Sequence, residues 1–241
     1  TTDFFKLSPM PNGKTDTNNI GGVSCDLIGG NHGADWDWTT LTHAERDRVA
    51  ARHRDWQLGL VWTVRHHPRV PQAIRDFYAP WGLPRDEFTT NGHWPRELYV
   101  REARRMAADF VMTERHCRGE LPVEDPVGYG AYALDSHHTR RVVHQGMVKN
   151  EGDVQLSLGG RPYGIAYRAL TPRAAECDNL LVPWALSATH LASGSIRMEP
   201  VFMRLGESAA TAAALAVERD IAVQAVPYRD LRARLFLPAM D

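Results

Sequence analysis

Residues 176–217, ECDNLLVPWALSATHLASGSIRMEPVFMRLGESAATAAALAV, carry the strongest indication of the fold. The apolar run Leu180–Val182 lies between polar residues and a proline, which predicts a short buried strand. A polar, glycine-containing loop is expected over Ser187–Ser195. Pro200 then predicts the start of a long helix, because a proline and the acid Glu199 both favour the first helical turn.

The predicted helix is rich in glycine, serine and alanine between Gly206 and Ala214. Such small side chains let a helix backbone approach a strand or a ligand closely. Nucleotide-binding folds use a strand, a loop and a small-residue helix in this order. The arrangement directs the N–H groups of the helix N-terminus at an electron-rich ligand. An ordinary buried strand–helix unit of an α/β domain fits the same pattern.

The composition is that of a globular protein, with 43% hydrophobic and 24% charged residues among 241. This length allows one large domain or two small ones. The formal net charge of -1 gives no general attraction to nucleic acid or to an anionic membrane, and no apolar run has the length of a bilayer span. We therefore expect neither partner. The residues from Thr1 show no signal-peptide pattern, which favours a cytoplasmic over an exported protein.

Three widely spaced cysteines, Cys25, Cys117 and Cys177, form no CxxC pair. The sequence therefore predicts neither a disulfide scaffold nor a zinc knuckle. The glycines of residues 29–33 do not follow the GxGxxG pattern, and no clear helix follows them, so no dinucleotide-binding loop is predicted there.

Local signals predict several further elements. Thr42 and Glu45 form a capping box for a long helix that ends at Pro68, and a second helix is expected between Pro71 and Pro80. Leu98–Val100 fits either a strand or the start of a helix through residues 102–114. Lys149–Val154 is expected to be a polar turn. Strands are predicted at Val23–Ile28, Tyr129–Leu134, Gln155–Leu158 and Tyr163–Leu170.

The segment Asp135-Ser136-His137-His138 directly follows a predicted strand, where residues often face a site. Adjacent histidines of an extended segment point to opposite faces, and no HxH or HExxH spacing is present, so no metal site is predicted. Ser136 lies in no GxSxG elbow, which argues against a serine hydrolase. What remains is a histidine that acts as a base beside a redox cofactor.

Two residues of the predicted strand Tyr163–Leu170 are further candidates for the site. Tyr167 and Arg168 are suited to line a polar substrate cavity. Strand tyrosines are also common packing residues whose hydroxyl has a partner inside the protein.

Five segments together resemble one family. They are KTDTNN (residues 14–19), WPRELYVREARRM (94–106), DSHH (135–138), KNEGDV (149–154) and SATHLASGSIRMEPVFMRLGESAATAA (187–213). In this order they resemble the FAD-dependent oxidoreductases, glutathione-reductase-like flavoproteins that include members labelled xanthan lyases. The resemblance implies a mixed α/β (α+β) fold of the FAD/NAD(P)-binding type and an FAD cofactor. It also implies a substrate domain over residues 1–175 and an FAD-contacting segment over residues 176–241.

The resemblance also assigns site residues. It implies that His137, with His190 as second candidate, takes a proton from the substrate. Arg197 would stabilise the negative charge that reduced flavin carries around N1 and O2. Glu199 would contact the cofactor or pair with Arg197. The remaining implied cofactor contacts are Asn18, Asn19, Ser195, Ile196 and Met198.

The GxGxxG unit that opens this family is missing from the sequence, so the matches correspond to the C-terminal half of a complete enzyme. We expect a second chain or segment to carry that unit, and we expect this chain alone to bind FAD poorly.

The predicted function is oxidation of a small polar substrate, possibly a carbohydrate or polyol, by hydride transfer to flavin N5. Two alternatives stay open. A polysaccharide lyase or hydrolase would use Tyr167, His137 and Arg168, and a carbohydrate-binding module would use the loop tryptophans Trp36, Trp38, Trp81 and Trp94.

Overall fold

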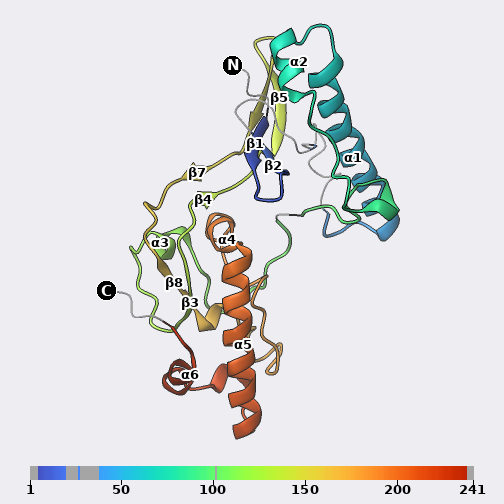
Figure 1. Cartoon of the computed structure of the whole chain (residues 1–241). Helices are drawn as coiled ribbons and strands as arrows, with labels where there is room; N and C mark the ends of the chain where they lie inside the picture. The colour runs from blue at the N-terminus through green and yellow to red at the C-terminus, as the bar shows by residue number, and fades with distance from the viewer. Residues whose placement is uncertain (1–4, 20–26, 28–37, 101, 238–241) are drawn as a thin grey trace. The chain divides into compact units, whose positions relative to one another are not determined.

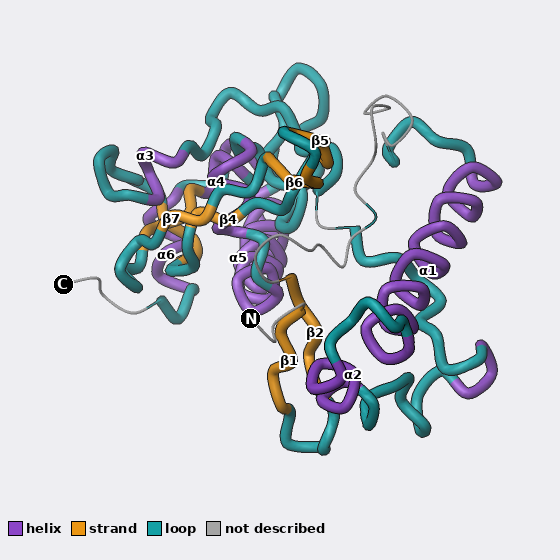
Figure 2. The backbone as a smooth tube through the Cα atoms, turned by 90° about the horizontal axis from the view of Figure 1, so that it is seen from above, coloured by secondary structure: helices purple, strands orange, loops and turns teal. Residues whose placement is uncertain are grey.

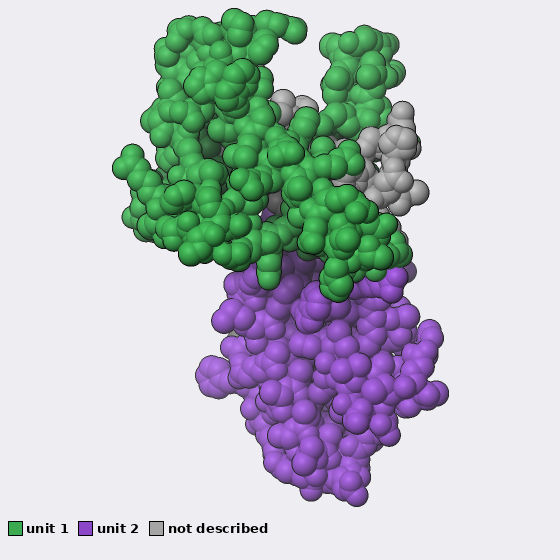
Figure 3. All heavy atoms as spheres, turned by 90° about the vertical axis from the view of Figure 1, so that its right-hand side faces the viewer, with its two compact units in different colours: residues 1–100, 138–153 green, residues 101–137, 154–241 purple. Residues whose placement is uncertain are grey.

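The computed structural model describes residues 5–19, 27, 38–100 and 102–237. These residues contain both helices and short strands (Figure 1), which confirms the predicted mixed α/β class. The chain forms two compact units, coloured separately in Figure 3. Unit 1 comprises residues 1–100 and 138–153, and unit 2 comprises residues 101–137 and 154–241. The predicted functional division after residue 175 falls inside unit 2 and stays a prediction.

The helices of unit 1 follow the local signals of the sequence. Helix α1 (His43–His66) begins with the predicted capping box, in which Thr42 Oγ1 accepts from the Glu45 N–H and Glu45 Oε2 accepts from the Thr42 N–H at 2.8 Å. It ends at His67, because the following proline disfavours a helical residue before it. Helix α2 (Gln72–Tyr78) confirms the second prediction.

The core of unit 1 is small. Its buried side chains are Val64, Val70, Ile74 and Tyr78, and Leu7, Leu60 and Val61 pack against them. Val64 is thus the residue of α1 that is buried in this core, whereas Val49 and Trp56 are partly exposed.

Two antiparallel hairpins complete unit 1. Strand β1 (Phe5–Pro9) pairs with β2 (Thr15–Asn19), and β5 (Arg140–His144) pairs with β6 (Met147–Glu151), as Figure 2 shows. The two residues that connect β5 to β6, Gln145 and Gly146, both have positive φ, as a two-residue hairpin turn of type I′ requires. The predicted polar turn at Lys149–Val154 is wrong for its first three residues, which belong to β6.

Unit 2 is built around one long helix. Strand β3 (Pro126–Gly130) pairs antiparallel with β8 (Tyr163–Ala166), and β4 (Leu134–Asp135) pairs with β7 (Gln155–Leu156). Helix α5 (Glu199–Arg219) packs on β3. Unit 2 also contains the short helices α3 (Glu114–Cys117), α4 (His190–Ile196) and α6 (Tyr228–Arg234), and the 3-10 turns η2 (Tyr167–Ala169) and η3 (Val223–Ala225). A further 3-10 turn, η1 (Thr89–Asn91), lies in unit 1.

The predicted start of α5 at Glu199-Pro200 is confirmed. The helix ends at Asp220, whose φ of 52° is left-handed, and the Ile221 N–H donates to the Ala216 carbonyl at 3.0 Å in a Schellman-type ending. One face of α5 buries five side chains in the core of unit 2: Leu205, Ala209, Ala212, Leu215 and Ala216.

Several predicted elements are wrong. The run Leu180–Val182 forms no strand, and the side chain of Leu180 is 47% exposed. Leu98–Val100 and the described residues from Glu102 to Ala108 form neither strand nor helix. The predicted strand at Tyr163–Leu170 is regular only as far as Ala166.

In place of the predicted strand Tyr129–Leu134, the structure has β3, which ends at Gly130, and β4, which begins at Leu134. The predicted strand Gln155–Leu158 is shorter, since β7 ends at Leu156. The predicted strand Val23–Ile28 lies outside the described residues, apart from Leu27. Among the described helices, none is both long and apolar enough to cross a membrane.

Candidate functional site

Helix α4 occupies the segment where a loop was predicted. Thr189 caps it, with Oγ1 accepting from the Ala192 N–H at 3.4 Å. Serines and a glycine favour loops in isolation, so the sequence alone predicts the wrong structure here. Gly194 has a packing role, because a Cβ atom at this position would lie 2.0 Å from the Asp135 carbonyl oxygen. The backbones of α4 and β4 therefore approach more closely than any other residue type would allow.

An ion pair joins the ends of these two elements. Arg197, which directly follows α4, places Nη2 2.9 Å from Asp135 Oδ2, and the two side chains are only 10% and 11% exposed. Tyr132 also donates its hydroxyl hydrogen to Asp135 Oδ2 at 3.3 Å. The structure thus brings the predicted DSHH segment against the predicted flavin-contacting segment, and the carboxylate that binds Arg197 is that of Asp135.

The guanidinium of Arg197 retains hydrogen-bonding capacity. Its Nε atom is buried and has no hydrogen-bond partner among the described residues. The backbone N–H groups nearby are used, since Arg197 donates to Ser193 O at 2.9 Å and Met198 donates to Ile196 O at 2.7 Å. The Nε atom of Arg197 is therefore a buried donor whose hydrogen-bonding capacity the described residues leave unused.

Hydrogen bonds of buried hydroxyl groups connect α4 to the segments that contain Tyr132 and Tyr163. The Ser195 hydroxyl donates to Tyr132 O at 2.5 Å and accepts from the Tyr163 hydroxyl at 2.6 Å. Burial raises the pKa of Tyr163 above its usual range, and it raises the pKa of the Cys117 thiol to about 11. At neutral pH both side chains stay protonated, so these hydrogen bonds anchor α4 through uncharged groups.

Another predicted segment also contacts α4. His190, the first residue of the helix, has Nδ1 3.2 Å from Glu102 Oε2, and the two side chains are 45% and 34% exposed. Arg105 Nε donates to the Ala188 carbonyl at 3.0 Å. Segments 94–106, 135–138 and 187–213, which were separate in the sequence, therefore meet at α4.

The other predicted site residues have different partners. The Tyr167 hydroxyl donates to Val223 O at 2.7 Å inside the core. Arg168 binds Asp125 through Nε and Nη2 at 3.0 and 3.1 Å and lies 4.5 Å from the centre of the Phe110 ring. Asp125 raises the pKa of Arg168 further through these hydrogen bonds. A substrate-lining role for Tyr167 and Arg168 stays a prediction.

The DSHH segment itself is tightly bound. Ser136 donates its N–H to Val154 O at 2.9 Å, and its hydroxyl oxygen accepts from the Val154 N–H at 3.0 Å. His138 Nε2 lies 3.9 Å from Asp153 Oδ2. His137 is half-buried beside it. In the described part of the chain, no group of three or more histidine, cysteine or acidic side chains is arranged to hold a metal ion.

The predicted cofactor residues Asn18 and Asn19 lie in unit 1, at the end of β2, opposite Lys6 and Phe5 of β1. Lys14, from the same predicted segment, binds Asp86 and Glu87 at 2.9 and 2.7 Å. Sequence reasoning did not assign Tyr132, Tyr163 or Glu102 to the site. Glu102 stood inside a segment that resembles the family, whereas nothing local to the two tyrosines indicated their roles.

Comparison with known proteins gives one family. The family model described as FAD dependent oxidoreductase matches residues 1–235, nearly the whole chain. No curated protein and no solved structure matches the chain significantly.

Proposed function

Because the chain belongs to the FAD-dependent oxidoreductase family, we propose that it supplies one wall of the flavin site in an enzyme that oxidises a small polar substrate, such as a carbohydrate or polyol. FAD is the cofactor of the family, and when bound it supplies the N5 atom that accepts hydride from a substrate C–H bond. The remaining steps depend on side chains of this chain.

The observation that carries the proposal is that Nε of Arg197 has no hydrogen-bond partner in the part of the chain that the structure describes. A buried N–H without a partner costs about 1–3 kcal/mol, so an acceptor on a ligand would relieve that cost. Asp135 fixes the guanidinium at 2.9 Å and restricts its rotation. The residues present thus fit the cofactor at one contact, in which the electron-rich pyrimidine edge of FAD would accept a hydrogen bond from Arg197. The neighbouring residues Ser195, Ile196, Met198 and Glu199 would form the backbone beside this contact.

Two histidines remain candidates for the proton acceptor, His137 and His190. The contact with Glu102 favours His190, because a carboxylate beside Nδ1 orients the imidazole. Nε2 is then the atom that would take the hydroxyl proton as the substrate loses hydride. His137 lies beside Ser136, whose hydrogen bonds to Val154 fix the local backbone.

We further propose that a second chain or segment carries the GxGxxG unit and packs on α5. The helix exposes Met203 (76%) and Val217 (82%), with Ala210 and Ala214 also exposed on it. Spacings of three, four and seven residues place them on one face, together with the exposed Glu207, which pairs with Arg204. The small and apolar side chains of this face are suited to close packing against another element.

The test uses the native complex, purified through a tag on this chain. We expect it to contain flavin, seen as the visible absorption band, and a polypeptide segment with a GxGxxG unit. Arg197→Gln should lower the flavin midpoint potential, whereas Arg197→Lys should retain most of it, because a cation near N1 favours reduced FAD. An unchanged potential in Arg197→Gln would show that Arg197 does not contact the flavin.

A further inference from the structure

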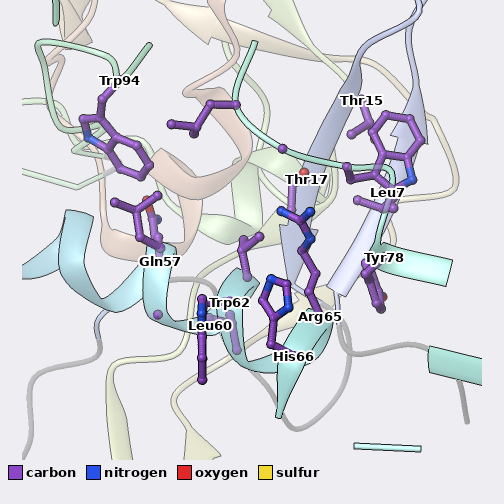
Figure 4. A pocket seen from close by; sticks show the side chains of 16 residues that line it. Leu7, Thr15, Thr17, Gln57, Leu60, Trp62, Arg65, His66, Tyr78 and Trp94 are labelled. Atoms are coloured by element: carbon purple, nitrogen blue, oxygen red, sulfur yellow. The ribbon is translucent and has the colours of Figure 1, made fainter. Parts of the chain in front are cut away.

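Unit 1 contains a pocket whose lining includes none of the residues assigned to the flavin contact. Its volume is about 660 Å³ and it is lined by α1, by the β1–β2 hairpin and by the residues that follow α2 (Figure 4). Sites for small organic ligands have volumes of about 300–1,000 Å³, so the pocket is large enough for a ligand with one or two rings.

The wall of this pocket is mainly apolar and aromatic. Three indoles line it, Trp62, Trp81 and Trp94, together with the aliphatic side chains of Leu7, Leu58, Leu60, Val61 and Leu83. The indole of Trp62 is 58% exposed, and its ring centre is 5.6 Å from that of His66. Aromatic walls of this kind favour a flat apolar ligand, because stacked or edge-to-face rings add about 0.5–1.5 kcal/mol to the burial of apolar area.

The charge on the described wall of the pocket is positive and comes from Arg65. Arg65 and His66 line the pocket, and none of its described lining residues is acidic. Arg65 donates from Nη2 to the Ala79 carbonyl at 3.0 Å, whereas its Nε is buried and has no hydrogen-bond partner among the described residues. The positive charge of the Arg65 guanidinium would attract an anionic acceptor on a ligand, and no carboxylate of the described wall would repel it.

We propose that this pocket binds a small organic carboxylate with a flat aromatic or apolar body, whose carboxylate meets Arg65. The proposal goes beyond the flavin contact, since the pocket belongs to unit 1 and Arg197 to unit 2. A sugar fits less well, because its many hydroxyl groups need polar partners. The hydroxyl of Thr15, one of few polar groups of the wall, already bonds to Ser8 O at 3.2 Å.

The test is isothermal titration calorimetry of the full chain with 2-naphthoate and with the uncharged 2-naphthamide. We expect naphthoate to bind at least about tenfold more tightly, as a charge-assisted hydrogen bond predicts. Arg65→Gln should weaken naphthoate binding to the level of the amide and leave the amide unchanged. Arg65→Lys should keep part of the preference. Trp81→Ala should weaken both ligands.

Arg48→Gln is the matched control, because Arg48 is exposed on the same helix and does not line the pocket. It should bind both probes as the unmodified chain does, and thermal melts monitored by circular dichroism show which variants are folded. Equal affinity for the two probes, no binding of either, or tighter binding of glucuronate than of naphthoate would each overturn the proposal. FAD content of the native complex is a separate measurement, so failure here leaves the proposed flavin contact untouched.

Discussion

Arg197 and Asp135 are 62 positions apart in the sequence, yet Nη2 of the first lies 2.9 Å from Oδ2 of the second. The pair is nearly buried, and it connects the end of α4 to β4. Both segments resemble the same family, and this contact brings them together in the folded chain.

Asp135→Asn should destabilise unit 2 by about 3 kcal/mol, because it leaves the charge of Arg197 buried without a counter-ion. Urea unfolding followed by circular dichroism measures the loss. The control is Asp109→Asn, since Asp109 is 83% exposed in its pair with Arg173 and should cost less than about 0.5 kcal/mol. An equal loss of unfolding free energy in the two variants would contradict the view that burial makes the Arg197–Asp135 pair important for stability.

Gly194→Ala should lower the melting temperature strongly or prevent folding of unit 2, because the new Cβ would lie 2.0 Å from a backbone oxygen that cannot move aside cheaply. Gly206→Ala is the matched control in α5, where a Cβ meets nothing within 4 Å. We expect it to stabilise the protein by about 0.5–1 kcal/mol, the helix preference of alanine over glycine. Thermal melts of both variants decide the point, and a tolerated Gly194→Ala would refute the close approach.

Cys117 should react slowly with iodoacetamide in the folded protein, whereas the partly exposed Cys177 should react first. Burial holds the pKa of Cys117 at about 11, so its thiolate is scarce at neutral pH. The same shift makes stability fall with alkali. The unfolded chain loses this proton near its ordinary value of 9.0, whereas the folded protein holds it to about 11, so the stabilisation from this group declines between those values.

Peptide mapping by mass spectrometry identifies which cysteine is alkylated, and urea titrations at rising pH follow the stability. Labelling of Cys117 as fast as Cys177 would show that the thiol is accessible. In Cys117→Ala the part of the alkaline decline due to this thiol should disappear.

Thr42→Ala should destabilise α1 by about 1 kcal/mol, because it removes the side-chain half of the capping box. Thr63→Ala makes the same chemical change inside the same helix, where the hydroxyl only bonds back to the Gly59 carbonyl at 2.7 Å. We expect it to be neutral or slightly stabilising. Helix content against temperature measures both, and similar effects of the two substitutions would argue against a capping role.

The elements that the sequence predicts correctly are those whose signals are local. Thr42, Glu45 and Pro200 mark helix ends through hydrogen bonds and backbone angles that depend on a few neighbouring residues. The family resemblance was also visible in the sequence, because it rests on the order of short segments, and the family match over residues 1–235 confirms it.

The elements that the sequence misses depend on distant contacts. Ser193, Gly194 and Ser195 predict a loop by propensity, but the glycine allows contact with β4 and Ser195 bonds to Tyr132 and Tyr163. Leu180–Val182 looks like a buried strand, yet no neighbouring strand pairs with it in the described structure. In both cases the tertiary environment overrides the local preference.

The reciprocal hydrogen bonds between Ser136 and Val154 stand where the chain leaves unit 2 and where it returns. These bonds pair the two segments of unit 2 between which the β5–β6 hairpin, a part of unit 1, stands in the sequence. In the connectivity of the chain, residues 138–153 therefore form an insertion: a segment of unit 1 interrupts the sequence of unit 2, and the Ser136–Val154 pair closes the interruption.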